Sequence, residues 1–213
     1  MTPTIIDSNS LQAAGKLRHQ FFVQEKAWVA DGGSMLELDH YDPHALHFGV
    51  ELNGELVAYM RGLRGDAPTG YMLDHDFYAC LTPELHMCLE RRNGMELSRR
   101  VVSNSLSRAE GLQAVELLFK TFSQYALGDD IKSVYLVQEP AYTPMLQRIF
   151  GLNFTTLNPE PYTFPDGTCV VVVSASSDDL IAGLKSRGKW SSYENFISTS
   201  KLQFNYSPRI ASE

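Results

Sequence analysis

Three carboxylates stand close together in the stretch Met35 to Asp42, which reads M-L-E-L-D-H-Y-D. Glu37, Asp39 and Asp42 lie within six residues, ahead of an apolar, strand-like run from His47 to Leu52. Carboxylates this close raise one another's pKa unless a cation lies among them. An extended segment that runs into a turn can direct at least two of them into one pocket. The cluster is therefore either a solvated acidic turn or part of a site that holds positive charge.

Two charged residues interrupt apolar strands further along the chain. Arg61 lies within Val57 to Leu63, where it either faces solvent or meets a carboxylate. Glu96 lies in Met95 to Ser103, a predicted strand, and a buried glutamate costs stability unless it is paired. Glu96 therefore indicates either chemistry or an internal ion pair. Strict alternation predicts two faces for this strand, one with Glu96, Ser98 and Arg100 and the other with Leu97, Arg99 and Val101.

Trp28, by contrast, has an ordinary explanation in core packing, although it stands beside the turn Asp31-Gly32-Gly33 and close to the carboxylates. The six histidines and three cysteines show no metal-ligand spacing, so we expect no metal and reduced thiols.

Composition excludes several classes of function. With 213 residues and 44% hydrophobic residues, the chain is long enough to bury a sizeable core. A net charge of -7 argues against a general nucleic-acid binder, which needs a basic surface. No apolar run approaches the roughly 20 residues that cross a bilayer, and the N-terminus lacks the pattern of a signal peptide. We therefore expect a cytoplasmic protein without a membrane partner.

Periodicity predicts the elements that position these residues. A first helix, capped by Asp7 or by Ser8 to Ser10, runs to about Lys26, and Asn53-Gly54 joins a hairpin of His47–Leu52 and Glu55–Leu63. Later helices are expected at Pro83–Arg92, Ser107–Ala126 with Gly128 as its C-cap, Tyr142–Phe150 and Asp178–Lys185, and strands at Ser133–Val137 and Cys169–Ala175. This order predicts one α/β domain over 1–213, a mixed sheet with helices on both faces, with the last 25 or so residues less regular.

The charged and aromatic residues, taken in order, match a known family pattern. An Arg, a Phe four residues later and a Trp six beyond that are Arg18, Phe22 and Trp28. An acidic motif E-x-D-x-(Y/F)-D is matched by Glu37 to Asp42, and E-x-S-R by Glu96 to Arg99, while Arg61 and Phe77 fill the positions between. Over about residues 15 to 155 the chain resembles the LuxI-type acyl-homoserine lactone (autoinducer) synthases of quorum sensing. Their fold is similar to that of the GCN5-related N-acetyltransferases (GNAT-like).

The resemblance implies an acyltransferase with S-adenosylmethionine as a substrate and no cofactor. An acyl group passes from acyl carrier protein or acyl-CoA to the amine, and the product then closes to a lactone with release of methylthioadenosine. The implied catalytic residues are Glu96, Ser98 and Arg99, with Glu96 as the base that deprotonates the amine, directly or through water. The implied adenosylmethionine-binding residues are Arg18, Phe22, Trp28, Asp39, Asp42 and Arg61.

The acyl donor sets the remaining expectations. We expect an apolar acyl pocket that includes Phe77, Val101, Val137 and Met145, and a basic patch with Arg148 and Lys120 for the anionic carrier. Two departures from the family pattern matter. The family's R-L-L-P-T reads R-G-L-R-G-D-A-P-T from Arg61, and the strand Ser133–Val137 lacks the threonine of members that prefer 3-oxo-acyl donors.

Three alternatives remain open on the sequence. The chain can be an N-acyltransferase that acylates another amine without lactonisation, or a ligand-binding module without catalysis. It can also be a scaffold in which Glu37, Asp39, Asp42, Arg61 and Arg99 only form an internal ion-pair network.

Overall fold

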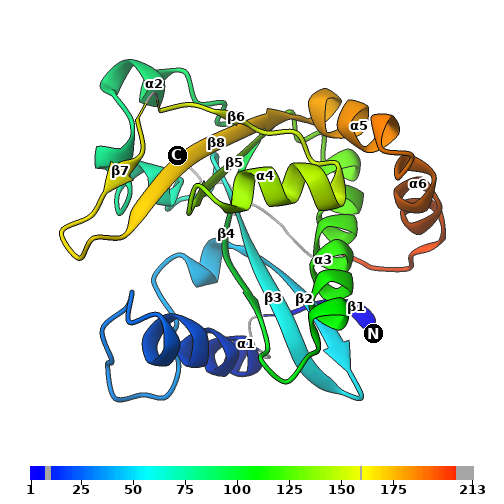
Figure 1. Cartoon of the computed structure of the whole chain (residues 1–213), viewed down its shortest axis with the longest axis horizontal. Helices are drawn as coiled ribbons and strands as arrows, with labels where there is room; N and C mark the ends of the chain where they lie inside the picture. The colour runs from blue at the N-terminus through cyan, green and yellow to red at the C-terminus, as the bar shows by residue number, and fades with distance from the viewer. Residues whose placement is uncertain (8–10, 159, 205–213) are drawn as a thin grey trace, which may run out of the picture. The chain divides into compact units, whose positions relative to one another are not determined.

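The computed structural model describes residues 1–7, 11–158 and 160–204, and Figure 1 shows its elements. The described residues form two compact units. The first contains those within Met1–Gly62, Arg99–Phe122 and Lys201–Glu213, and the second those within Leu63–Ser98 and Ser123–Ser200. The single domain over 1–213 stays a prediction. The predicted capping residues Ser8 to Ser10 lie outside the described part of the chain.

The first unit is built on a β-hairpin. β2 (Leu46–Leu52) and β3 (Glu55–Arg64) pair antiparallel, with Leu46 opposite Gly62. At the turn between them, Asn53 and Gly54 have φ of 55° and 83°, the left-handed pair of a type I′ turn. The predicted hairpin is thus confirmed. β1 (Thr2–Ile5), which we did not predict, adds a short antiparallel strand to the other side of β2.

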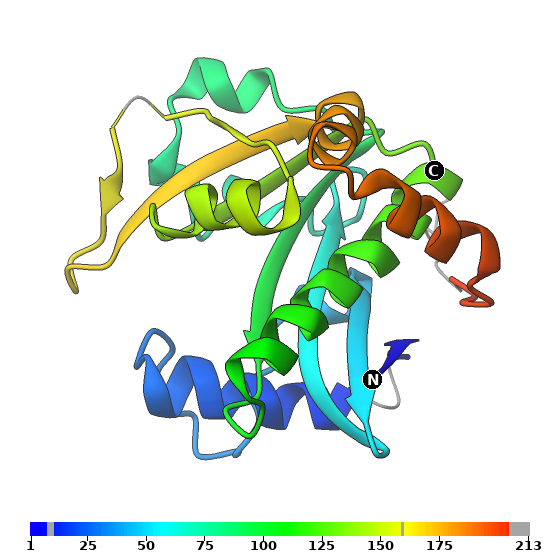
Figure 2. The ribbon, with the colours of Figure 1, turned by 45° about the vertical axis from the view of Figure 1, so that its right-hand side comes forward.

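Helices cover both faces of this hairpin. Tyr59 lies opposite Gly49, so it points to the other face from Phe48, the neighbour of Gly49 along β2. Tyr59 packs with Leu11, Ala14 and Leu17 of α1 (Leu11–Arg18), while Phe48 meets Phe122 of α3 (Arg108–Gly128) with ring centroids 6.2 Å apart. Figure 2 shows α3 crossing its face of β2 and β3.

Local sequence explains where these two helices begin and end. α1 continues as a π-helical segment, η1 (His19–Glu25), which confirms the predicted extent of the first helix. α3 begins at a capping box, in which Ser107 Oγ accepts the Glu110 N–H and the Glu110 carboxylate accepts the Ser107 N–H. The predicted cap Gly128 is instead the last helical residue, and Asp130 takes the left-handed conformation with φ of 53°.

The second unit pairs three main strands. β5 (Ser133–Gln138) runs parallel to β4 (Gly94–Val102) and antiparallel to β8 (Cys169–Ser176). The short strands β6 (Thr155–Thr156) and β7 (Tyr162–Thr163) also pair with β8. Across the sheet the strands are hydrogen-bonded in the order β1-β2-β3-β4-β5-β8-β6, and both β3 and β4 contribute residues to each unit. The predicted fold class, a mixed α/β sheet, is confirmed.

The helices of the second unit follow the predictions with two corrections. α4 (Tyr142–Met145) and η5 (Leu146–Phe150) end at Gly151, whose φ is 74°, and α5 (Ser177–Ser186) begins at a capping box on Ser176. The helix predicted over Pro83–Arg92 is wrong in length, because α2 stops at Met87. α6 (Trp190–Thr199) forms a regular helix where only a helix fragment was expected.

Single-turn 3₁₀ helices occupy Asp42–His44, Met72–Asp74 and Tyr78–Cys80. In the described residues no helix is both long and apolar enough to cross a membrane.

β4 departs from regular strand geometry at Arg99. Its register with β5 ends at the pair Leu97 and Leu136, and Arg99 then takes a left-handed backbone with φ of 52°. A left-handed residue in a strand interrupts the regular pleat. Arg99 and Val101 nevertheless both pack toward Phe22, as their predicted common face requires.

Candidate active site

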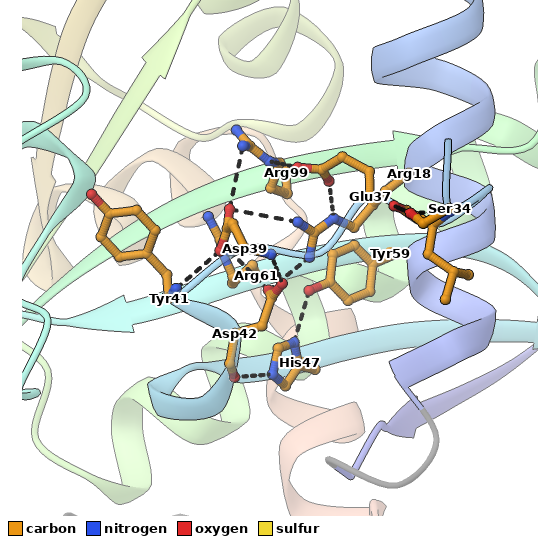
Figure 3. A network of polar contacts seen from close by, with 11 residues as sticks. Arg18, Ser34, Glu37, Asp39, Tyr41, Asp42, His47, Tyr59, Arg61 and Arg99 are labelled. Atoms are coloured by element: carbon orange, nitrogen blue, oxygen red, sulfur yellow. Dashed lines mark hydrogen bonds and ion pairs between the residues drawn. The ribbon is translucent and has the colours of Figure 1, made fainter. Parts of the chain in front are cut away.

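Three arginines and three carboxylates meet in one ion-pair network within the first unit (Figure 3). They come from the end of α1, the segment before β2, the strand β3 and the bend of β4, elements far apart in the sequence. The members are Arg18, Glu37, Asp39, Asp42, Arg61 and Arg99.

Arg18 is fully buried and contacts every carboxylate of the network. Its Nε bonds the Glu37 carboxylate, its Nη1 lies 2.7 Å from Asp42 Oδ1, and its Nη2 lies 3.6 Å from Asp39 Oδ2. Its guanidinium also stands over the Tyr59 ring, 5.7 Å from the centroid. One guanidinium therefore contacts all three carboxylates of the acidic motif.

Arg61 and Arg99 complete the network from the strands. Arg61 Nη1 lies 2.5 Å from Asp39 Oδ1 and 2.8 Å from Asp42 Oδ1. Arg99 Nε lies 3.1 Å from Glu37 Oε1, and its Nη2 lies 3.3 Å from Asp39 Oδ2. The question left open for Arg61 is thus settled, because its side chain enters the interior to meet carboxylates.

The acidic segment holds itself in shape through its own side chains. The Asp39 N–H donates to Asp42 Oδ2 at 2.7 Å, and the Tyr41 N–H donates to Asp39 Oδ1 at 3.0 Å. Upstream, the Glu37 N–H donates to the Gly15 carbonyl of α1 at 3.0 Å. The carboxylates therefore act both as turn formers and as ion-pair partners.

The network is electrically neutral and mostly buried. Three formal positive charges balance three negative ones, and the side chains of Arg18 and Arg61 are 0% exposed. Asp39 and Arg99 keep 18% and 15% of their side chains exposed, so they form its solvent-facing edge. The cations that the carboxylates require are arginines of this chain. The predicted solvated turn is excluded for Glu37 and Asp42, whose side chains are 4% exposed.

The charges shift the ionisation of the network's members in opposite directions. Burial works to raise the pKa of Asp42, but Arg18 and Arg61 outweigh it, and that pKa lies below its ordinary value. Burial works to lower the pKa of Arg61, yet Asp39 outweighs it and the pKa is raised. Each side of the network thus stabilises the charge of the other.

An aromatic group lies at the end of η1. The Phe22 and Trp28 rings lie 6.2 Å apart at 34°, and Phe21 meets both edge-on. The Arg99 guanidinium stands 5.4 Å from the Phe22 centroid, and Lys26 Nζ stands 4.9 Å from that of Trp28. Phe22 is buried, whereas Trp28 is 37% exposed, so the core-packing interpretation of Trp28 is wrong. Its exposed ring can take a ligand.

Glu96 lies in the core of the second unit. It is 0% exposed, and its Oε2 accepts the Leu73 N–H at 3.2 Å. Burial, assisted by the charge of Glu96, raises the pKa of Cys80 to about 11. Ser98, two residues further on, is half-buried. The sequence alternatives for Glu96 were chemistry or an ion pair, and the backbone hydrogen bond from Leu73 does not decide between them.

The predicted acyl-pocket residues separate into different clusters. Phe77 and Val137 pack against the buried cluster of the second unit that contains Tyr71, Leu73 and Cys80. Val101 packs instead with the α1 cluster in the first unit, and half-buried Met145 belongs to neither set. A shared acyl pocket is therefore supported by packing only for Phe77 and Val137.

The two residues predicted for carrier binding also differ. Arg148 on η5 is exposed and lies in the second unit. Lys120 on α3 is only 13% exposed and pairs with Glu116 at 3.3 Å, which leaves little of it for a partner. In the described residues no group of three or more His, Cys, Asp or Glu side chains is arranged to hold a metal ion.

Sequence reasoning missed several members of the site. Glu37 was recognised in the acidic motif but not assigned to the substrate set, although Arg18 and Arg99 both bind it. His47 and Tyr59 were not singled out, and no motif marks them. The only signal that could have identified them is strand register, because the pairing of β2 with β3 places His47 opposite Arg61.

Comparison with known proteins agrees with this geometry. Residues 17–115 match the acetyltransferase (GNAT) domain family. The AHL synthase LasI has a TM-score of 0.69 at 22% identity, with 87% of this chain and 94% of LasI covered. The CoA-dependent acyl-homoserine lactone synthase BjaI, solved with SAM and isopentyl-CoA, has a TM-score of 0.70 at 19% identity, with 94% and 92% covered.

A third similar structure widens the class. FeeM, an N-acyl amino acid synthase from uncultured soil microbes, has a TM-score of 0.67 at 15% identity, with 87% of this chain and 96% of FeeM covered. No curated protein matches the sequence. The chain therefore has the GNAT-like fold of these acyltransferases, which confirms the predicted fold and agrees with the predicted enzyme class.

Proposed function

We propose that the protein is an acyl-homoserine lactone synthase that makes a quorum-sensing signal from S-adenosylmethionine and an acyl thioester. The observation that carries the proposal is the convergence of Arg18, the acidic motif, Arg61 and Arg99 in one network, in a chain with this fold. Residues spread over 82 positions, from 18 to 99, would not be joined in this way by a chance match of short motifs.

The first step forms an amide. The amine nitrogen of adenosylmethionine attacks the thioester carbonyl, the carbon–sulfur bond breaks, and the carrier leaves as a thiol that takes up the proton the amine loses. Glu96 is the candidate base for this proton, directly or through water, with Ser98 and Arg99 next along the strand. A carboxylate in a water-poor surrounding suits proton transfer to and from a bound amine.

The second step closes the ring. The methionine carboxylate attacks its own γ-carbon, the bond from that carbon to the sulfonium breaks, and the electron pair neutralises the sulfur of methylthioadenosine. No outside proton or oxidant is needed, because one negative and one positive charge disappear together. The step requires the substrate to be held in a folded conformation, which is a matter of positioning.

The arginine–carboxylate network supplies that positioning. Since its charges already balance, Asp39 and Asp42 do not require the ammonium or sulfonium of the substrate as their counter-charge. We assign Asp42, Arg18 and Arg61 to the buried part of the network, which holds the site in shape. Asp39 and Arg99 form the partly exposed edge that meets adenosylmethionine. The exposed ring of Trp28 attracts the sulfonium as it attracts other cations, and buried Phe22 packs beside it with ring centroids 6.2 Å apart.

The acyl donor is an acyl carrier protein or an acyl-CoA. The CoA-dependent enzyme BjaI and its bound isopentyl-CoA support the second choice, and exposed Arg148 can serve the phosphates of either donor. Phe77 and Val137 are the acyl-pocket residues that packing supports best.

A second candidate is an N-acyltransferase that does not lactonise. FeeM, which is similar in fold over nearly its whole length, is an N-acyl amino acid synthase and favours this alternative. Such an enzyme uses the first step alone and releases no methylthioadenosine.

The experiment that separates them measures methylthioadenosine and acylated product together. Purified protein is incubated with adenosylmethionine and a panel of acyl-CoA and acyl-carrier donors, and an extract of expressing cells is analysed by mass spectrometry. Equal amounts of an acyl-homoserine lactone and methylthioadenosine support the proposal. An acylated amine without methylthioadenosine would establish the alternative. If no donor is turned over, the protein is better explained as a ligand-binding module without catalysis.

A further inference from the structure

A histidine–tyrosine pair lies directly beneath the ion-pair network (Figure 3). His47 Nε2 lies 2.9 Å from the Asp42 carbonyl oxygen, and His47 Nδ1 lies 2.7 Å from the Tyr59 hydroxyl. His47 comes from β2 and Tyr59 from β3, and both are fully or almost fully buried. None of the sequence motifs includes either residue.

The Asp42 carbonyl fixes which atom donates in the first of these bonds. A carbonyl oxygen only accepts, so His47 Nε2 carries the proton and donates to Asp42. The unprotonated Nδ1 then accepts from the Tyr59 hydroxyl. This arrangement is that of the neutral imidazole, whereas a doubly protonated ring would donate to the Tyr59 hydroxyl as well, so the surrounding charges decide between the two states.

The charges around the pair favour the same neutral state. Arg18 from α1 and Arg61 from β3 both face it, while the Asp42 carboxylate is the opposing charge. Burial and the two arginines lower the pKa of His47 to about 4, and burial raises the pKa of Tyr59 to about 12. Neutral His47 therefore adds no fourth positive charge to a balanced network.

We propose that His47 and Tyr59 are positioning residues of the adenosylmethionine site, acting through the Asp42 main chain and the Arg18 guanidinium. The inference rests on the proposed function, since it assigns that site to this network. The N–H of His47 anchors the Asp42 carbonyl from below, while Arg18 and Arg61 hold its carboxylate from above. The Tyr59 ring supports Arg18, and its hydroxyl fixes the tautomer that His47 needs.

Two substitutions of His47 separate positioning from core packing. In His47→Gln the amide nitrogen reaches as far as Nε2 and can still donate to Asp42. In His47→Asn the amide oxygen reaches only as far as Nδ1, so it can accept from Tyr59 but the bond to Asp42 is lost. Both variants replace a buried ring with a smaller amide and should lower the melting temperature similarly.

The expected result is a difference in substrate binding between the two variants. Loss of a hydrogen bond to a buried carbonyl weakens the binding of a ligand that depends on that bond about tenfold. His47→Asn should therefore raise the Kd and the KM for adenosylmethionine about tenfold, with kcat at saturation within about twofold. His47→Gln should stay within about threefold of the native protein. Equal effects from both variants, or no effect from either, would overturn the proposal.

Phe48→Leu is the matched control. Phe48 precedes Gly49 on the same strand, is 0% exposed, and packs against Phe122 on the opposite face. It should lower the melting temperature without changing adenosylmethionine affinity. A change in affinity equal to that of His47→Asn would mean that general destabilisation explains the effect, which would also overturn the proposal.

A second measurement keeps the inference testable if the proposed function fails. If the native protein binds no adenosylmethionine, the proposed function is refuted. The stability of the network can still be measured without substrate, through the rate of hydrogen exchange at Arg18 Nε–H, which bonds Glu37. Exchange should be faster in His47→Asn than in His47→Gln and Phe48→Leu. Equal exchange in all three variants would refute positioning by His47.

Discussion

Replacing Asp42 by asparagine tests whether the network is a cooperative, buried unit. Asp42 Oδ1 accepts from both Arg18 and Arg61, and Oδ2 accepts the Asp39 N–H at 2.7 Å. An asparagine of the same shape has one acceptor oxygen and one NH₂ donor. If the oxygen faces the arginines, the NH₂ opposes the Asp39 N–H, and in the flipped rotamer it opposes two guanidinium groups. Neither rotamer satisfies the site.

The size of the effect follows from charge and burial. The substitution leaves a net positive charge in a network whose two central arginines are 0% exposed. Breaking a buried ion pair from one side costs about 3–5 kcal/mol. With a denaturant slope of about 2.5 kcal/mol per molar urea, a loss of about 4 kcal/mol moves the unfolding midpoint down by about 1.6 M.

The assay is urea unfolding at neutral pH, which needs no substrate and so does not depend on the proposed function. Asp130→Asn is the matched control, since Asp130 is 69% exposed and pairs with exposed Lys132. Its cost should be below about 0.5 kcal/mol, because exposed ion pairs contribute little and asparagine accepts its left-handed backbone. A loss for Asp42→Asn below about 1 kcal/mol, or equal to that of the control, would refute the reasoning.

Three further predictions concern pH, catalysis and the aromatic group. The folded pKa of His47 is about 4 against an ordinary 6.5, so the unfolded chain binds the extra proton first. Stability should fall by up to about 3 kcal/mol as pH drops from 6.5 to 4, and His47→Gln should remove that slope in pH-dependent urea unfolding. Glu96→Gln should reduce methylthioadenosine formation about a hundredfold or more with adenosylmethionine affinity little changed, and retained turnover would exclude Glu96 as the base. Trp28→Ala should weaken adenosylmethionine binding about tenfold in calorimetry. It should lower the free energy of unfolding by less than about 1 kcal/mol, because 37% of the residue is exposed. A larger loss of stability without weaker binding would mean that Trp28 is a core-packing residue.

The elements that sequence predicted well are those with a local cause. Asn53-Gly54 imposes its hairpin through backbone conformation, and the apolar stripe and capping box of α3 specify a long helix without help from distant residues. The charged residues of the site were also found, because charges in apolar runs are conspicuous. Their partners were harder to assign, since nothing in the sequence near Arg61 says which carboxylate it meets.

The features that sequence missed depend on tertiary context. β1 has four residues, too few for a periodic signal, and exists because β2 offers it an edge. His47 has a role only because the hairpin register and the acidic turn bring Tyr59 and Asp42 to its two nitrogens. Val101 was expected in the acyl pocket, but it packs with Phe22 and Tyr59 in the α1 cluster, a contact that no local pattern in the sequence indicates.

The left-handed backbone of Arg99 also limits how this strand can be redesigned. For a residue with a β-carbon, that conformation costs roughly 1–2 kcal/mol, so the strand is locally under tension. Arg99→Gly would relieve this backbone cost but would also remove the guanidinium that joins Glu37 and Asp39 and leave the network with an excess negative charge. Because the lost ion pairs outweigh the relieved strain, directed evolution for thermostability alone should keep this arginine and its left-handed backbone.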